Sequence, residues 1–196
     1  MLYQLAVGEV EHDSGVLDIA QLSARLAYAM MCLALCWGAL TSMGWVSRLT
    51  GRQALRSSHM VLSILTLAFV AVHGLAFLYM QAQPWTLVQV LVPFNSGVKL
   101  PQTLGILAFE GMLASAVVVG LRRWLSYYRW LWLHRLAYPA FALGVLHALL
   151  SAMANGHVGI LWLGGIALLM PAVTMTALRF LPARALATTG LIEDAP

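Results

Sequence analysis

The sequence is poor in charged residues. Only 9% of its 196 residues are Asp, Glu, Lys or Arg, against about 25% in an average soluble domain. Hydrophobic residues make up 61% of the chain. Such a chain cannot cover a water-exposed surface with polar groups, so we expect a membrane protein. Its net charge of +4 comes from arginines at the ends of apolar segments, which does not indicate nucleic-acid binding.

The sequence also has few cysteines and no nucleotide-binding motif. The two cysteines, Cys32 and Cys36, lie one helical turn apart, which is a poor geometry for a disulfide. No metal-binding spacing accompanies them, so we expect them to pack in the core. No glycine-rich phosphate loop follows a strand. Residues 1–20 lack the basic start of a cleaved signal peptide.

Long apolar segments are what the sequence does contain. Each is close to the ~20 residues that cross ~30 Å of hydrocarbon, and only helices satisfy the backbone there. We predict an all-α, polytopic membrane helical bundle with about five transmembrane helices, spanning residues 23–180. An extracytoplasmic segment, 1–22, precedes it and a cytoplasmic tail, 181–196, follows. The five candidate spans are 23–45, 57–80, 103–121, 130–152 and 159–178.

The basic residues predict an orientation. Arginines gather in the loops after the first, third and fifth spans, whereas the loops after the second and fourth carry only Lys99 or no basic residue. The positive-inside rule then places the N-terminus outside and the C-terminus in the cytoplasm. The arginines concerned are Arg48, Arg52, Arg56, Arg122, Arg123, Arg129, Arg179 and Arg184.

Four histidines lie within the second and fourth spans, where an imidazole is costly and indicates function. His73 follows His59 by 14 residues, and His147 follows His134 by 13. At ~1.5 Å per residue these spacings are ~21 Å and ~20 Å, so the histidines match at two depths of one bilayer. Neutral imidazole is a common axial ligand of haem iron. The layout predicts two stacked b-type haems between the second and fourth helices.

Helical phase fits one of the two spans better than the other. At ~100° per residue, His73 returns to within ~40° of His59, whereas His147 lies ~140° round from His134. Pro139 lies between the latter two and removes a backbone hydrogen bond. We therefore expect a kink or a change of winding in the fourth span.

Residues 25–180 resemble the ferric-reductase-like transmembrane domain of NADPH oxidases, ferric reductases and stand-alone bacterial haem proteins. The resemblance rests on the early histidine pair, on the run HRLAYPAFALGVLH, and more weakly on GRQALRSSH, VHGLAFLY and LVPFNSGVKLPQTLGILAFE. The family uses the same two spacings, which resolves the phase problem by precedent. It implies that His59 and His134 bind an inner haem b, and that His73 and His147 bind an outer one.

The sequence departs from the larger family members. Full-length oxidases and reductases carry a C-terminal flavin and nicotinamide domain and a further N-terminal span, and neither is visible here. The stand-alone relative in bacterial methionine-sulfoxide repair typically lacks the first early histidine. The presence of His59 therefore favours two haems over one. We expect the protein to lie in a bacterial plasma membrane.

Five further residues have expected roles at the cofactors. Arg56 and Arg135 lie beside the inner histidines and are candidates to pair with haem propionates, or to anchor to lipid headgroups. Arg25 is a weaker candidate for the outer propionates. Phe69 and Phe141 lie between the two histidine levels. They either pack as ordinary aromatic residues or fill the space between the haems.

Three other polar residues are less specific. Glu110 is the only acidic residue well inside a span. It is a candidate to carry protons, to tune the outer haem, or to accept a structural hydrogen bond. His12 and His157 lie in predicted outer loops, and we do not expect them to be ligands.

The sequence thus predicts an oxidoreductase component that transfers electrons across the bilayer through haem b. Its donor is expected to be a separate cytoplasmic flavin reductase, a bound FMN or FAD, or a quinol. Its acceptor is expected to be ferric iron, oxygen or an outer-face protein. Lipid is the expected surrounding partner, and nucleic acid is not a partner. The alternatives are a non-catalytic haem-binding subunit, such as a sensor or assembly factor, and a proton-coupled transporter.

Overall fold

A computed structural model describes residues 2–42, 51–156, 158–160 and 164–180 of the chain. These residues form helices and turns, and no strand occurs among them. Arg48, His157, Arg184 and the predicted tail at 181–196 lie outside the described residues, as do residues 43–45 of the first predicted span and 161–163 of the fifth.

Within the described part of the chain, four helical segments are long and apolar enough to cross a membrane. They comprise Val10–Ser42, Arg52–Tyr79, Leu100–Gly120 and Tyr127–Ala154. The elements that form them are α1 (Leu2–Ser42), α3 (Arg52–Ala76) with the 3₁₀ turn η1 (Phe77–Tyr79), α5 (Leu100–Gly120), α6 (Tyr127–His134) and α7 (Ala137–Ala154). The prediction of an all-α membrane bundle is therefore confirmed.

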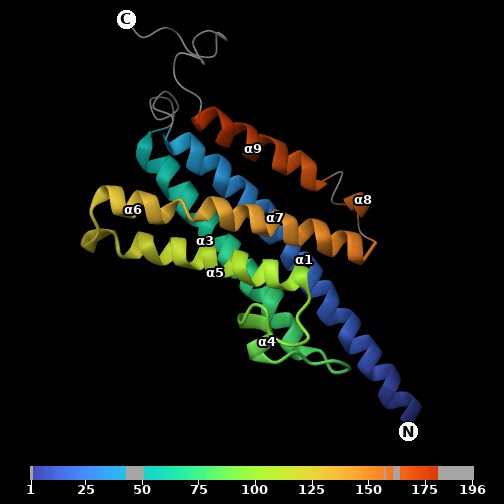
Figure 1. Cartoon of the computed structure of the whole chain (residues 1–196). Helices are drawn as coiled ribbons and strands as arrows, with labels where there is room; N and C mark the ends of the chain where they lie inside the picture. Colours follow the sequence, from blue (N-terminus) through green and yellow to red (C-terminus); the bar gives the residue numbers. More distant parts are fainter. Residues whose placement is uncertain (1, 43–50, 157, 161–163, 181–196) are drawn as a thin grey trace, which may run out of the picture.

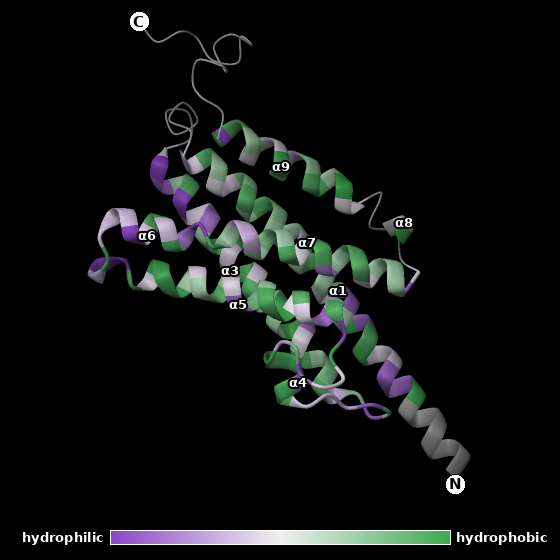
Figure 2. Ribbon diagram, viewed as in Figure 1, coloured by the Kyte–Doolittle hydropathy of each residue, from purple (hydrophilic) through white to green (hydrophobic). Residues whose placement is uncertain are grey.

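The remaining elements are shorter. The fifth predicted span corresponds in part to α8 (Val158–Ile160) and α9 (Ile166–Phe180), a shorter apolar helix that packs on α1. The connections contain α4 (Leu87–Leu91) and η2 (Arg122–Trp124). Hydrophobic residues dominate the long helices, and hydrophilic residues gather near the start of α3 and at the α5–α6 turn (Figure 2).

The long helices associate as two packed pairs, α1 with α3 and α5 with α7 (Figure 1). Small residues allow α5 and α7 to approach closely: a Cβ added at Gly111 would lie 2.9 Å from the Cβ of Ala140. The backbones of α3 and α7 hardly approach each other. The two pairs therefore leave a separation that is bridged by side chains rather than by close helix contact.

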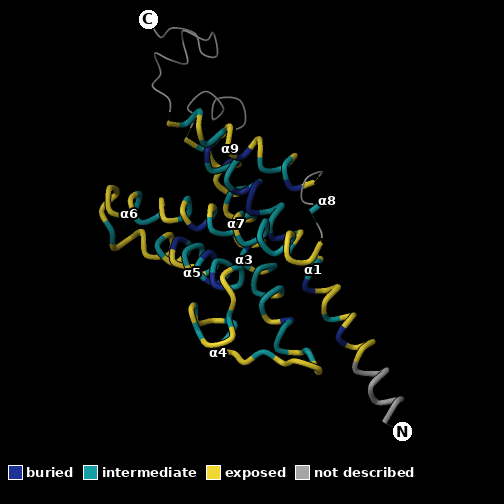
Figure 3. Tube along the Cα trace, turned by 45° about the vertical axis from the view of Figure 1, so that its right-hand side comes forward, coloured by how far each residue is buried: buried dark blue, intermediate teal, exposed yellow. Residues whose placement is uncertain are grey.

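Most of the buried side chains belong to α1 and α5 (Figure 3). Cys32 of α1 is fully buried and Cys36 is half-buried, and both are free thiols. This agrees with the expectation that the cysteines pack in the core. In the apolar stretches of α3 and of α6–α7, only 6% of the residues are buried within the protein. In the apolar stretches of α1 and α5, the buried share is 28%. The histidine-bearing helices are thus the least covered by protein.

The fourth span is interrupted between α6 and α7, at Arg135 and Leu136. Pro139 explains the position, because a proline ring clashes with the carbonyl four residues earlier, which is that of Arg135, and cannot donate to it. The amide of Tyr138 instead bonds to the Arg135 carbonyl, three residues back, at 3.0 Å. The expected change of winding is present, one turn before the proline. It alters the angle around the helix axis that separates His134 from His147.

The connection after α3 is fastened to α1. Asp13 is buried, and its carboxylate accepts hydrogen bonds from the backbone N–H groups of Gln81 at 2.7 Å and Ala82 at 3.0 Å. One turn of the connection is thereby capped by a side chain from a helix about 70 residues away in sequence. The early polar residues of the chain consequently hold the end of the bundle that carries α4.

Candidate functional site

The four intramembrane histidines meet in two pairs. His59 of α3 faces His134 at the end of α6, with ring centres 6.2 Å apart and planes at 90°. His73 of α3 faces His147 of α7, with ring centres 6.1 Å apart and planes at 64°. These are the pairs expected from depth and family resemblance. We call them the basic-end pair and the α4-end pair, after the arginine-rich end of the bundle and the end that carries α4.

Hydrogen bonds fix the tautomer of three of these rings. The Nδ1 of His59 lies 2.9 Å from the carbonyl of Ala34, and that of His73 lies 2.9 Å from the carbonyl of Ala20. The Nδ1 of His147 lies 2.7 Å from the carbonyl of Pro101. A carbonyl only accepts, so each Nδ1 carries the proton. Each Nε2 therefore presents a free lone pair, as a metal ligand requires.

The fourth ring reaches the same state through a hydroxyl. The Oγ of Ser115 lies 3.0 Å from the Nδ1 of His134 and 3.2 Å from the carbonyl of that residue. Because the hydroxyl donates its single proton to the carbonyl, it accepts from the Nδ1–H. All four imidazoles thus have Nδ1 occupied and Nε2 available.

The acceptors come from the helices that carry no intramembrane histidine. Ala20 and Ala34 of α1 serve His73 and His59, respectively, and Pro101 and Ser115 of α5 serve His147 and His134. The acceptors on each helix are 14 residues apart, close to the histidine spacing on the neighbouring helix. Our sequence reasoning missed them, because three are backbone carbonyls that any residue type could supply.

Two glycines provide room for the rings. A Cβ added at Gly105 would lie 2.8 Å from the Nδ1 of His147, and one at Gly38 would lie 3.1 Å from the Cε1 of His59. In each case the glycine follows the carbonyl acceptor by four residues, at Pro101 and Ala34 respectively. A helix carbonyl points toward the next turn, so the ring that donates to it lies over that turn and needs a residue without a side chain there.

The separation of the rings fits one metal ion between each pair. Metal–imidazole bonds are about 2 Å long, so two imidazoles on opposite sides of one ion have ring centres about 6 Å apart. Among the described residues, no group of three or more His, Cys, Asp or Glu side chains gathers as a metal site. A pair of imidazoles with no further protein ligand suits haem iron, whose other four ligands come from the macrocycle.

Two buried polar atoms have no hydrogen-bond partner among the described residues. They are Nε1 of Trp130, near the basic-end pair, and Oε1 of Gln102, which follows the acceptor Pro101. Buried polar atoms normally have partners, so a polar group at each level is to be expected. The indole N–H of Trp130 can donate to a haem propionate, whereas Oε1 of Gln102 is an acceptor and needs a donor, which a propionate carboxylate is not. The residues at the basic end therefore fit this group.

The surroundings of the two pairs differ. At the basic end, the indole of Trp130 stacks on His134 with ring centres 5.4 Å apart and planes at 7°, and the guanidinium of Arg122 lies 4.9 Å from the centre of the indole. At the α4 end, Phe77 meets His73 edge-on at 5.4 Å, and Trp85 packs against Phe77. One pair therefore has a cation nearby and the other an aromatic cover.

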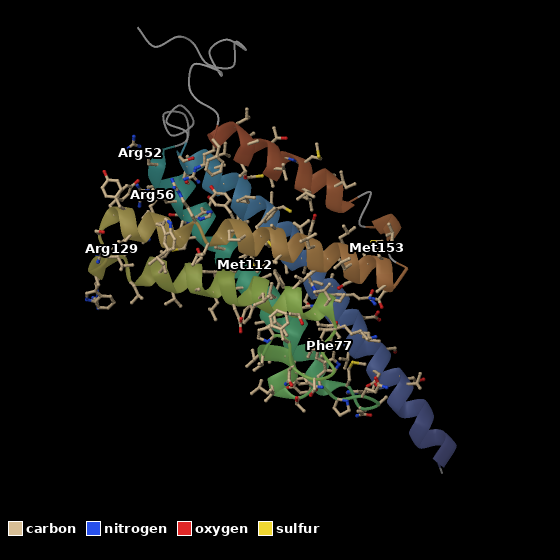
Figure 4. All side chains as sticks on the ribbon, viewed as in Figure 1. Arg52, Arg56, Phe77, Met112, Arg129 and Met153 are labelled. Atoms are coloured by element: carbon tan, nitrogen blue, oxygen red, sulfur yellow. The ribbon has the colours of Figure 1, made fainter. Side chains whose placement is uncertain are left out.

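The arginines expected at the propionates are exposed. Arg56 on α3, Arg135 in the α6–α7 break and Arg25 on α1 all have exposed side chains. Arg25 lies 3.4 Å from the side-chain oxygen of Gln21. Arg52, Arg56 and Arg129 lie toward one end of the bundle and Phe77 toward the other end of α3 (Figure 4). The arginine that contacts the aromatic stack is Arg122, for which no cofactor role was expected.

The other candidates occupy less specific positions. Phe69 and Phe141 are half-buried on α3 and α7, whereas Glu110 is exposed on α5. His12 is exposed, and its Nε2 lies 3.0 Å from the carbonyl of Tyr79. His12 therefore helps to fasten the connection after α3, and no contact joins it to the histidine pairs.

Comparison with known families identifies the bundle. Residues 23–145 match the family described as ferric reductase like transmembrane component. The chain belongs to this family. The match covers both histidines of α3 together with His134, and ends two residues before His147. Comparisons with curated proteins and with solved structures found no match. Family membership makes the chain a membrane-embedded redox component that contacts lipid.

Proposed function

We propose that the chain holds two haem b groups and is the membrane part of a reductase that carries electrons across the bilayer. One observation carries this proposal: four intramembrane imidazoles form two facing pairs, each with Nε2 free and ring centres 6.1 or 6.2 Å apart. Haem iron supplies one-electron chemistry at potentials that its ligands and their surroundings set.

The residues of the chain hold and insulate these groups. His59 and His134 would hold the group at the basic end, and His73 and His147 would hold the one at the α4 end. The carbonyl acceptors orient three of the imidazoles, and the Ser115 hydroxyl orients the fourth. Arg56, Arg135 and Arg25 remain candidates for the propionates, through side-chain rearrangement from their exposed positions. Lipid and apolar side chains exclude water around both levels.

The direction of transfer follows from the proposed topology. The positive-inside rule supports a cytoplasmic location for the arginine-rich end, and with this topology the basic-end pair is the inner one and the α4-end pair the outer one. We propose a separate cytoplasmic flavin reductase, or a quinol, as the donor. The acceptor on the other side would be ferric iron, oxygen or an outer-face protein.

Haem content tests the proposal directly. The purified chain should carry two haems per chain and show a b-type reduced-minus-oxidised spectrum. His73→Ala or His147→Ala should remove one haem and retain the other, and His59→Ala or His134→Ala should do the converse. His12→Ala, on an exposed histidine, is the matched control. Full haem content in each single ligand variant would overturn the assignment, and absence of haem would favour a transporter.

Electron delivery tests the functional half of the proposal. We expect NADPH and a cytoplasmic flavin reductase together to reduce the haem-loaded protein in vesicles that expose the basic end. NADPH alone should not reduce it, because these 196 residues contain no recognisable phosphate loop. A haem-loaded protein that accepts electrons from neither the flavin reductase nor a quinol would instead be a non-catalytic haem-binding subunit.

A further inference from the structure

The two histidine pairs differ in the acceptor that one of their rings uses. Both rings of the α4-end pair donate to backbone carbonyls, those of Ala20 and Pro101. In the basic-end pair, His134 donates to the hydroxyl of Ser115 instead. A hydroxyl oxygen is a weaker acceptor than an amide carbonyl. It leaves the imidazole less electron-rich, and therefore a poorer stabiliser of oxidised iron.

The pairs also differ in nearby charge. The Arg122 guanidinium lies over Trp130, which itself stacks on His134. A fixed positive charge near a metal favours the reduced state, because that state carries one positive charge fewer. At the α4 end, Phe77 packs on His73 and Trp85 packs on Phe77, and both side chains are uncharged. Charge and hydrogen bonding therefore act in the same direction at the basic end.

We propose that Ser115 and the Arg122–Trp130 stack give the haem held by His59 and His134 a higher reduction potential than the haem held by His73 and His147. This inference rests on the proposed function. Ser115 and Trp130 are positioning residues, since they act through His134. At equilibrium, an electron shared between the two levels would be held at the basic end. An inside-negative membrane potential would act in the opposite sense and favour its movement outward.

The stack also fixes the plane of one ligand. Trp130 is nearly parallel to His134, at 7°, which holds the imidazole at 90° to that of His59. The α4-end pair has an angle of 64°. The angle between axial imidazole planes controls the anisotropy of the low-spin ferric EPR signal. We expect two signals, with the larger anisotropy arising from the basic-end haem.

A redox titration of the haem-loaded, purified chain tests the order of the potentials. His147→Ala should leave the higher-potential haem and His134→Ala the lower-potential one. Arg122→Gln should lower the higher potential and leave the other unchanged. The matched control is Arg123→Gln, because Arg123 lies 4.0 Å over the exposed Trp124, whereas the ring under Arg122 stacks on His134. A lower potential in His147→Ala than in His134→Ala, or equal shifts in the two arginine variants, would overturn the inference.

Two further variants separate the hydrogen bond from the charge. Ser115→Ala should raise the higher potential further, because His134 then loses its acceptor. Ser63→Ala is its control: the Ser63 hydroxyl donates to the carbonyl of His59 at 2.8 Å and not to a ring. Trp130→Leu should change the more anisotropic EPR signal, whereas Trp124→Leu should not. An unchanged EPR spectrum and unchanged potentials in Trp130→Leu and Ser115→Ala would contradict the roles of these residues.

The outcomes distinguish this inference from the proposed function. A purified chain without haem, or one whose haem content is unaffected by the histidine variants, contradicts the proposed function itself. Two haems with the expected ligands but with the opposite order of potentials contradict only the inference.

Discussion

Gly105 lies directly beneath the imidazole of His147, where a single added methyl group would come within 2.8 Å of Nδ1 and 2.9 Å of Cε1. His147 belongs to the α4-end pair, and its contact with Gly105 joins α5 to α7. The glycine is therefore part of the site, although it carries no side chain to bind anything. The same relationship recurs less tightly between Gly38 and His59, at 3.1 Å.

Gly105→Ala should displace His147 and remove the haem proposed for the α4-end pair. The added Cβ meets ring atoms closer than Cβ atoms in real structures approach other groups, and the ring cannot retreat without losing its bond to Pro101. We expect the haem-to-protein ratio to fall from about two to about one. Gly120→Ala, on the same helix, is the control, because a Cβ at Gly120 meets nothing within 4 Å. Equal haem contents in the two variants would contradict this account.

Gly38→Ala should have a milder effect at the basic-end pair. The nearest ring atom is at 3.1 Å, so His59 must move by a few tenths of an ångström rather than leave its position. We expect retained haem with a shifted absorption or EPR signal. Gly15→Ala on the same helix meets nothing within 4 Å and should leave the spectrum unchanged. Complete haem loss in Gly38→Ala would mean that the basic end tolerates less movement than its geometry indicates.

Asp13→Asn should destabilise the end of the bundle that carries α4. The carboxylate accepts from two backbone N–H groups, and a hydrogen bond to a charged acceptor is stronger than one to a neutral amide. Thermal unfolding in detergent should occur at a lower temperature, and protease should cleave near Gln81 more readily. Asp18→Asn is the control, since Asp18 is exposed on the same helix. A similar loss in both variants would argue against a specific role for Asp13.

Cysteine labelling should establish the orientation. We expect a membrane-impermeant reagent added outside to label Asn155→Cys, between α7 and α8, but not Gln53→Cys, at the start of α3. Both positions are exposed, and the positive-inside rule predicts that the second lies in the cytoplasm. Cys32 and Cys36 should be replaced by Ala beforehand. The nearby glycines Gly51 and Gly156 are less suitable for labelling, because their φ angles of 80° and 72° would strain a cysteine. Reversed labelling would invert the proposed direction of electron transfer.

Local pattern was sufficient to predict the class of the protein and the depth of its histidines. Hydrocarbon imposes helical backbone on any long apolar segment, and the constant rise of a helix converts residue spacing into depth. His59 and His134 therefore had to lie at one level, and His73 and His147 at another, once the spans were recognised. The need for altered winding before His147 also followed from sequence, because Pro139 cannot complete a regular helix.

Only the tertiary structure decided what surrounds each imidazole. The sequence does not identify Ala20, Ala34 and Pro101 as carbonyl acceptors, since every residue has a carbonyl. Gly38 and Gly105 become necessary only when a ring from another helix approaches them. The stacking of Trp130 on His134 depends on the turn at which α6 breaks, and the exposure of Glu110 depends on how α5 is rotated in the bundle. These features arise from distances between helices, which residue order along one helix does not determine.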